Sequence, residues 1–193
     1  MQRPFSQAAE NNKGPIAEIL GHYLDHGDLL EIGSGTGQHA VWMAPRFPAV
    51  RWHPSEQPEN MTGLNRWLEA HPCPSLQAAT ILRVQGRWPE HRFRHIYTAN
   101  TFHILSRPLV ERCVQRLCEH LTPQARAYIY GPFNYQGHYT SDSNRRFDLH
   151  LKSQSLSMGI RDQEWVAALF ARHGRVLLAD HAMPANNRLL VFH

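Results

Sequence analysis

Long apolar runs are missing from this chain of 193 residues, and cysteine is scarce. No stretch approaches the ~18 consecutive apolar residues that a membrane-spanning helix needs, and the first residues contain no apolar signal core. The three cysteines, Cys73, Cys113 and Cys118, show no CxxC spacing, so we expect reduced thiols rather than a disulfide framework. These absences predict a cytoplasmic chain that makes no contact with a membrane.

Lysine is equally scarce, occurring only at Lys13 and Lys152, so arginine carries almost all of the positive charge. The formal net charge of +4 is compatible with an anionic partner but does not require nucleic acid. Histidine, by contrast, is abundant. The fourteen histidines are scattered singly, without the HxH or HExxH spacing of paired metal ligands, so we expect no metal site.

What the sequence does contain is an alternation of short apolar runs with longer amphipathic stretches, typical of a parallel sheet wrapped by helices. No repeat, low-complexity tract or linker divides it, so residues 1–193 are expected to form a single domain. The predicted strands are 28–32, 50–53, the end of 76–84, 95–99, 125–130, 175–179 and 188–192. The predicted helices are 12–24, 38–47, 59–70, 108–121, 143–151 and 162–173. In the first of these helices, Pro15 is expected in the first turn, where its missing N–H costs nothing.

The connection between the last two predicted strands, residues 180–187, is too short for a crossover helix. These two strands must therefore run antiparallel to each other. The expected fold is α/β and Rossmann-like, of the class I methyltransferase type: a seven-stranded, mostly parallel sheet with an antiparallel last strand and helices on both faces. Residues 133–160 are too long and too polar for a plain connector, and we expect them to form a lid-like insertion.

A glycine-rich loop follows the first predicted strand and opens the next helix. Its residues are Glu31, Gly33, Ser34, Gly35, Thr36 and Gly37. Glycines allow positive φ and a close approach of the backbone to a ligand, and the helix start offers free N–H groups. A dinucleotide fingerprint would need a third glycine where Gln38 stands, and no GK[ST] follows as in a P-loop. The alternative is a glycine turn with no ligand.

The charge of Glu31 narrows the choice of ligand for this loop. Its carboxylate suits a cofactor with a cationic amino group, such as the methionine end of S-adenosylmethionine (SAM), and would repel a pyrophosphate. A second carboxylate, Glu56, directly follows the next predicted strand, where ribose hydroxyls are bound in folds of this kind. The alternative for Glu56 is a solvated loop position. Together the two carboxylates favour a nucleoside cofactor, with SAM as donor and S-adenosylhomocysteine (SAH) as product.

Several segments resemble those of the DUF938 group, also called the methyltransferase-like 26 family. The matching segments are 6–13 (SQAAENNK), 31–39 (EIGSGTGQH), 54–56 (PSE), 100–104 (NTFHI), 130–133 (YGPF), 159–162 (GIRD) and 183–187 (MPANN). They cover essentially the whole chain, and the last two are specific because a generic methyltransferase does not require them. The resemblance implies the seven-stranded fold and SAM, without a characterised substrate. Within these segments we expect Asn12, Lys13, His39 and Asn100 to contact the cofactor.

The adenine end of the cofactor site departs from the methyltransferase pattern. Many methyltransferases of this fold have an Asp near the end of the third strand, where residues 82–89 here contain no acidic residue. We expect adenine to be bound by the backbone of Val84 or Gln85, or by the Gln85 amide. Trp88 either flanks the ring or belongs to the core.

Residues 100–103 follow the fourth predicted strand, at the edge of the sheet where ligands bind. Methyl transfer mainly requires positioning and desolvation of the nucleophile, and a general base helps if the acceptor carries a proton. His103 is the candidate base, and a structural histidine is the alternative. Candidate substrate contacts are Phe102, Tyr139, Asn144 and Asn186, although Asn186 lies in a stretch that equally predicts a tight turn. Arg145, Arg146 and Arg161 are candidates for an anionic substrate, or simply surface arginines.

The leading hypothesis is a SAM-dependent methyltransferase with an unidentified, small-molecule acceptor. An RNA or protein methyltransferase is the second, and a nucleic-acid partner stays open although the NPPY signature of base methylation is absent. A non-catalytic SAM-binding protein is the third. A nicotinamide oxidoreductase is disfavoured by Gln38, and the sequence leaves the oligomeric state open.

Overall fold

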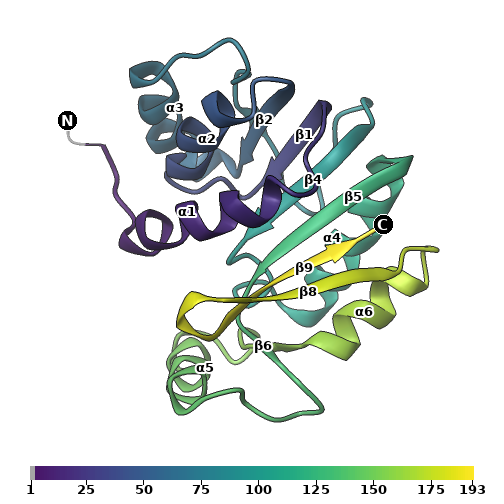
Figure 1. Cartoon of the computed structure of the whole chain (residues 1–193). Helices are drawn as coiled ribbons and strands as arrows, with labels where there is room; N and C mark the ends of the chain where they lie inside the picture. The colour runs from purple at the N-terminus through teal and green to yellow at the C-terminus, as the bar shows by residue number, and fades with distance from the viewer. Residues whose placement is uncertain (1–2) are drawn as a thin grey trace.

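A computed structural model describes residues 3–193 and shows one seven-stranded sheet with helices packed against it (Figure 1). The strand order is β3-β2-β1-β4-β5-β9-β8. The strands of this sheet are β1 Gly27–Ile32, β2 Val50–Glu56, β3 Thr80–Ile81, β4 Phe93–Ala99, β5 Leu121–Gly131, β8 Leu177–Met183 and β9 Asn187–Phe192. The helices are α1 Gln7–Leu20, α2 Gln38–Met43, α3 Met61–Ala70, α4 Arg107–His120, α5 Asp142–Gln154 and α6 Gln163–Ala171.

Strand directions follow the expectation from the sequence. β1, β2, β3, β4 and β5 pair in parallel, whereas β9 runs antiparallel to both of its neighbours, β5 and β8. The mostly parallel sheet with an antiparallel last strand is therefore confirmed. The short β8–β9 connection leaves no room for a crossover, which forces this reversal.

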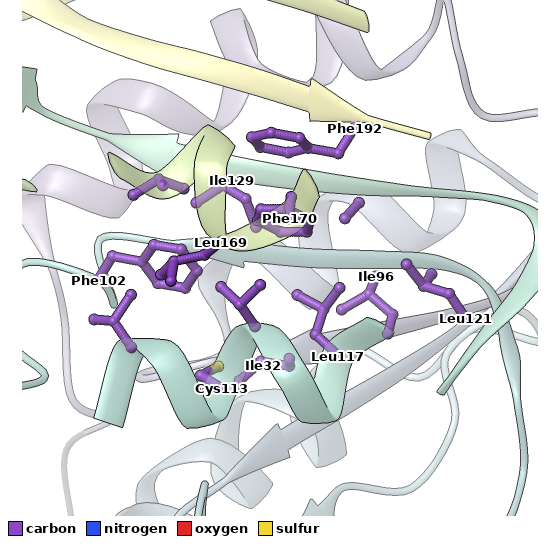
Figure 2. Packing of buried hydrophobic residues seen from close by; sticks show 14 of the residues in the cluster. Ile32, Ile96, Phe102, Cys113, Leu117, Leu121, Ile129, Leu169, Phe170 and Phe192 are labelled. Carbon is purple, nitrogen blue, oxygen red and sulfur yellow. The ribbon is translucent and has the colours of Figure 1, made fainter. Parts of the chain in front are cut away.

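Alternate residues along the central strands point to opposite faces of the sheet, and each face has its own apolar core. Leu29 of β1 packs with Ile16 on the face covered by α1 and α2. Its neighbour Leu30 points to the face covered by α4 and α6. Figure 2 shows this second core, where Leu117 of α4 and Phe170 of α6 pack against the sheet. Helices cover both faces, as expected.

The first helix begins earlier than its apolar pattern predicts. Helix α1 starts at Gln7, and the side chain of Ser6 caps it by accepting a hydrogen bond from the Ala9 N–H at 3.2 Å. The expected start at residue 12 was wrong, and so was the placement of Pro15, which lies inside the helix rather than in its first turn. The pattern misleads because the first turns of α1 pack no apolar stripe against the sheet. Instead they lie beside the cavities described below.

Other elements differ from the expectation mainly at their ends. Strand β2 continues through Glu56, so this carboxylate is the last residue of the strand rather than part of the following loop. The helix expected at 38–47 divides into α2 and a 3-10 turn, Ala44–Arg46, which contains Pro45. The helix expected at 59–70 likewise divides into a 3-10 turn, Pro58–Asn60, and α3.

The segment between β5 and α6 is closed at its base by a second, two-stranded sheet. Strand β6, Phe133–Asn134, pairs in parallel with β7, Arg161–Asp162. Helix α5 lies between them in the chain and beside the turn that joins β8 and β9 (Figure 1), where the Asn144 amide donates to the Asn186 carbonyl at 3.1 Å. Among residues 3–193, no helix is both long and apolar enough to cross a membrane.

Candidate functional site

The glycine loop lies where β1 ends and α2 begins, and its backbone requires glycine at specific positions. Gly33, Gly35 and Gly37 all have positive φ, of 70°, 55° and 89°. At Gly37 the requirement is also steric, because a Cβ there would lie 2.7 Å from Leu64 Cδ1 of α3. The loop therefore turns tightly and leaves backbone on its open side.

Glu31 lies in β1 directly before this loop and is almost completely buried, with 2% of its surface exposed. The indole N–H of Trp52 donates to its carboxylate at 2.8 Å, and the Ser34 hydroxyl also hydrogen-bonds it. Burial, with a smaller contribution from the nearby Glu56 carboxylate, outweighs these two hydrogen bonds and raises the pKa of Glu31 to about 7. Such a carboxyl group ionises readily when a cation enters beside it.

Glu56 faces the same loop from the end of the neighbouring strand. One of its carboxylate oxygens accepts the Gly35 N–H at 2.7 Å, and the other accepts the Gln57 N–H at 2.7 Å. Each oxygen has a second lone pair available for a ligand hydroxyl. The ends of β1 and β2 are joined further by the Ser55 hydroxyl, which donates to the Glu31 carbonyl at 2.6 Å.

A cavity of about 280 Å³, here called the loop cavity, opens over the glycine loop. Its lining residues are Ser6, Ala9, Glu31, Gly33, Ser34, Gly35, Thr36, His39, Ala99 and Asn100. Seven of the residues expected to bind a cofactor line it: Glu31, Gly33, Ser34, Gly35, Thr36, His39 and Asn100. The glycine loop between β1 and α2 therefore borders a cavity in the folded chain, as expected.

His39 lines the loop cavity but uses both of its ring nitrogens within the protein. Its Nε2 lies 2.7 Å from Asn12 Oδ1, and its Nδ1 lies 3.0 Å from the Tyr97 hydroxyl. Burial lowers the pKa of His39 to about 4, so the ring is neutral. This network fixes α1 against the sheet, which makes His39 a positioning residue for the N-terminal wall of the site.

A larger cavity of about 560 Å³, here called the asparagine cavity, adjoins the first. It is lined by residues of α1, the ends of β4 and β5, α5 and the β8–β9 turn: Ser6, Ala8, Asn11, Asn12, Asn100, His103, Tyr130, Pro132, Ser143, Asn144, Phe147, Pro184, Ala185 and Asn187. Ser6 and Asn100 line both cavities, so the two spaces meet at the end of β4.

Asn100 occupies the junction in a left-handed conformation, with φ of 58°. Its backbone N–H donates to the Tyr130 carbonyl at 2.9 Å, which holds the turn against β5. Gly131 completes the junction, since a Cβ there would lie 3.9 Å from Asn100 Oδ1 and 3.8 Å from His103 Nδ1. Asparagine tolerates this backbone better than most residues because its side chain can bond locally.

His103 lines the asparagine cavity and is 7% exposed. Among residues 3–193, no side chain or backbone group makes a hydrogen bond with its imidazole, whose edge contacts the Phe147 ring at a centroid distance of 5.2 Å. Burial, with a smaller contribution from the positive charge of Arg161, lowers the pKa of His103 to about 4. The ring is therefore neutral near pH 7.

Arg161 holds the segment that carries His103. Its guanidinium donates to the carbonyls of Phe102 at 3.2 Å, Ser157 at 2.8 Å and Leu105. The Gly159 N–H donates to the His103 carbonyl at 2.9 Å. Arg161 is therefore a structural tie between the insertion and the segment after β4, rather than the anion-binding group considered from the sequence.

A family model described as a protein of unknown function, DUF938, matches residues 3–193. The chain belongs to the DUF938 family. Solved structures similar to it include an O-methyltransferase family protein from Burkholderia thailandensis, with a TM-score of 0.82 and 11% identity over 94% of this chain and 55% of that one. An O-methyltransferase family 2 protein from Planctomyces limnophilus, in complex with apigenin, matches at 0.82 and 18% identity over 96% and 58%.

The mitomycin 7-O-methyltransferase MmcR also matches this DUF938 protein at a TM-score of 0.82, with 17% identity over 96% of this chain and 54% of that one. The DUF938 chain thus spans little more than half the length of these three proteins. At these identities the likeness shows the fold, which is the Rossmann-like class I methyltransferase fold expected from the strand pattern.

Several site residues expected in the DUF938 chain lie elsewhere. Phe102 is buried in the core between the sheet and α4 (Figure 2) and does not line either cavity. The Tyr139 hydroxyl donates to Asp148 at 2.7 Å, away from the cavity lining. Asn186 is exposed in the β8–β9 turn with φ of 57°, which fits the tight-turn alternative. Its neighbour Asn187 lines the cavity instead.

Other residues expected to bind the cofactor do not line the loop cavity. Lys13 forms an ion pair with Glu10 and lines neither cavity. Asn12 lines the asparagine cavity rather than the loop cavity. Val84 packs against the core and Gln85 is exposed, so neither lines the loop cavity, and Trp88 is a core residue with 3% exposure. Gly37 and Glu56 are not among the residues that line the loop cavity: Gly37 packs on Leu64, whereas Glu56 bonds the loop backbone and keeps lone pairs for a ligand.

Sequence reasoning did not name Ser6, Tyr130 and Asn187 as individual site residues of this DUF938 protein, although segments 6–13, 130–133 and 183–187 carry the family resemblance. Ser6 carried a usable signal, because serine is a preferred helix N-cap and therefore marks where α1 begins. Tyr130 and Asn187 reach the cavity only because β5 and β9 are neighbours in the sheet. Their position follows from strand order, which their local sequence does not indicate.

Proposed function

We propose that this DUF938 protein is a SAM-dependent methyltransferase that acts on a small molecule, as its resemblance to the methyltransferase-like 26 family implies. The observation that carries the proposal is the junction of the two cavities at Ser6 and Asn100. A donor bound over the glycine loop and an acceptor bound in the asparagine cavity would share one wall. Transfer between two bound molecules requires such a shared space.

The donor set of the loop cavity fits SAM. Glu31 offers a buried carboxylate for the ammonium group, and Glu56 offers carboxylate oxygens for ribose hydroxyls. SAM, when bound, supplies a methyl group on a positively charged sulfur. Glu31 is well suited to the ammonium group because its ionised carboxylate gains a partner there in a site with little water.

The chain's own residues then perform three tasks in the proposed reaction. The glycine loop and its two carboxylates bind and orient the donor. Helix α5 contributes Ser143, Asn144 and Phe147 to one wall of the asparagine cavity, so the insertion at about 133–160 acts as a lid that excludes water. His103, neutral and without a hydrogen-bonding partner, accepts the proton of the acceptor group.

The names of similar proteins are consistent with a small acceptor. One neighbour is in complex with apigenin, another is a mitomycin 7-O-methyltransferase, and CalO1, a methyltransferase in calicheamicin biosynthesis, has SAH bound. These are properties of those proteins, and they support the proposal through the shared fold.

A binding experiment separates the proposal from its main alternatives. SAM and SAH are expected to raise the melting temperature of the purified protein, whereas NADH is expected to leave it unchanged. Stabilisation by NADH alone would contradict the proposal. Labelled methyl transfer to metabolite, RNA and protein fractions then identifies the acceptor class: label mainly in RNA or protein would contradict a small-molecule acceptor, and binding without transfer to any fraction would indicate a non-catalytic SAM-binding protein.

A further inference from the structure

The asparagine cavity has no charged wall. Of its fourteen lining residues, none is Asp, Glu, Lys or Arg, within the part of the chain that the structure describes. Asp148 of α5 and Arg161, whose charge acts on His103, are both engaged elsewhere. Asp148 of α5 accepts from the Ile160 N–H at 2.6 Å and from Lys152 at 2.5 Å, and Arg161 donates to three carbonyls. A charged acceptor would lose its water in this cavity without gaining a counter-ion from the lining, which disfavours its binding.

Several polar atoms that line the cavity are open hydrogen-bond acceptors. The Asn144 amide nitrogen donates to the Thr140 hydroxyl at 2.9 Å and to the Asn186 carbonyl at 3.1 Å, which leaves its oxygen open. The Asn187 amide nitrogen donates to the Pro184 carbonyl at 3.1 Å, which again leaves the oxygen. The imidazole of His103 adds a third acceptor. These groups can accept hydrogen bonds from a ligand that brings its own donors, such as hydroxyl groups.

The rest of the lining is apolar and partly aromatic. Phe147 stands edge-on to the His103 ring, and Pro132, Ala8 and Pro184 contribute aliphatic surface. The Tyr130 hydroxyl is bonded by the side chains of Asn12 and Asn187, and the Asn187 amide nitrogen also donates to the Pro184 carbonyl, so these polar groups are partly engaged within the protein. The volume of about 560 Å³ is that of an ordinary small-molecule site.

Resting on the proposed function, we propose that the acceptor is an uncharged molecule that carries a hydroxyl group on an apolar or aromatic body, such as a neutral phenol. In the reaction the hydroxyl oxygen forms a bond to the methyl carbon as the carbon–sulfur bond breaks. The hydroxyl proton passes to the His103 imidazole and then to solvent. The products are a methyl ether and SAH, so atoms and charge balance.

The test uses para-substituted phenols of similar size whose substituents differ in charge. Near pH 7, methyl 4-hydroxybenzoate is uncharged, 4-hydroxybenzoate is an anion, and 4-hydroxybenzylamine is a cation. Binding of each to the full chain with saturating SAH is measured by ligand-detected NMR and calorimetry, and label transfer from SAM is measured in parallel. The neutral ester is expected to bind at least about tenfold more tightly than either charged compound.

A charge placed on the wall sharpens this test. Ser143 lines the cavity on α5, and Ser143→Lys is expected to narrow or reverse the preference against 4-hydroxybenzoate. Ser153→Lys is the matched control, because Ser153 is exposed on the same helix and lines neither cavity. The control is expected to keep the preference of the unaltered protein.

The outcomes distinguish the acceptor class from the function itself. If 4-hydroxybenzoate binds as tightly as its ester, or if no neutral phenol of the panel binds at millimolar concentration, the acceptor class is wrong even though SAM and SAH bind. If SAM and SAH fail to bind, the proposed function fails, and the inference fails with it. Both the acceptor class and the proposed function are supported if the neutral ester binds tightly and Ser143→Lys shifts the preference toward 4-hydroxybenzoate.

Discussion

The two cavities of this DUF938 protein adjoin at Asn100 but are built in opposite ways. The loop cavity consists largely of backbone from the glycine loop with the buried carboxylate of Glu31. The asparagine cavity consists of uncharged side chains from widely separated segments. If the proposed function is correct, we expect the first site to prefer a cationic molecule and the second a neutral one, and each expectation can be tested separately.

The largest expected effect is on the asparagine cavity side. His103→Ala is expected to lower the rate of methyl transfer by about 10²- to 10⁴-fold, because the general base is lost. The affinity for SAM, measured by calorimetry, is expected to stay within about twofold, since His103 does not line the loop cavity. Single-turnover label transfer measures the rate.

A loss of SAM affinity in His103→Ala would show that the two cavities do not act independently. A rate within a few-fold of the unaltered protein would show that His103 has only a structural role. His120→Ala is the matched control. The imidazole of His120 bonds the Arg116 carbonyl on α4 at 2.6 Å, and His120 lines neither cavity.

A smaller effect is expected from neutralising the loop cavity. Glu31→Gln keeps the shape of the side chain and an acceptor for the Trp52 indole, but removes the negative charge. We expect SAM to bind about 10- to 100-fold more weakly, the usual loss when a charged hydrogen bond becomes neutral. Calorimetry with SAM measures the loss.

Glu59→Gln is the control for Glu31→Gln, since Glu59 is an exposed carboxylate paired with Arg83 and lines neither cavity. It is expected to leave SAM affinity unchanged. Equal losses in both variants would point to long-range charge rather than to a contact at Glu31.

The pKa values of the two cavities predict different responses to pH. In the free protein the Glu31 carboxyl, with a pKa raised to about 7, keeps its proton below that pH and must release it to pair with a cation. SAM is therefore expected to bind about tenfold more weakly at pH 6 than at pH 8, as calorimetry at several pH values would show. The Glu31→Gln variant is expected to lose this dependence.

At saturating SAM, the rate is expected to stay constant from pH 8 down to about pH 5. His103, with a pKa lowered to about 4, becomes protonated and stops accepting protons only below that range. If the rate at saturating SAM instead fell with a midpoint near pH 7, the assignment of that pKa to SAM binding alone would be contradicted.

The smallest expected effect concerns Lys13, which the sequence placed in the cofactor set. Its amine pairs with Glu10 and lies over the Trp42 ring at 5.5 Å, outside both cavities. Lys13→Met is expected to leave SAM affinity within about twofold and to change the free energy of unfolding by less than about 1 kcal/mol. Calorimetry and thermal unfolding measure the two quantities.

The parts of the fold that depend on local chemistry were predictable. Glycines at Gly33 and Gly35 fix the turn after β1, and the short β8–β9 connection fixes the direction of the last strand. The start of α1 at Gln7 was not predicted, because Ser6 supplies a cap without an apolar stripe behind it. The position of Pro15 inside the helix was not predicted either, because the packing of α1 on the sheet outweighs the cost of an interior proline.

Site residues were predictable near the glycine loop and poorly predictable beyond it. Phe102 and His103 are adjacent in sequence, yet Phe102 enters the core and His103 faces the cavity. Tyr139 pairs with Asp148, and Asn187 rather than Asn186 reaches the lining. Each of these outcomes depends on a partner from another segment, which local sequence patterns do not reveal.

The sequence by itself determined the strand pattern, the reversal of the last strand and the loop cavity's carboxylate, because turn lengths, residue period and glycine backbone preferences act over a few residues. Only the tertiary structure decided that the asparagine cavity is uncharged. Arg161 is occupied by carbonyls and Lys13 by Glu10, so neither charge reaches the cavities. Which charges remain available is settled when distant segments pack together, because burial requires each charge to find a partner.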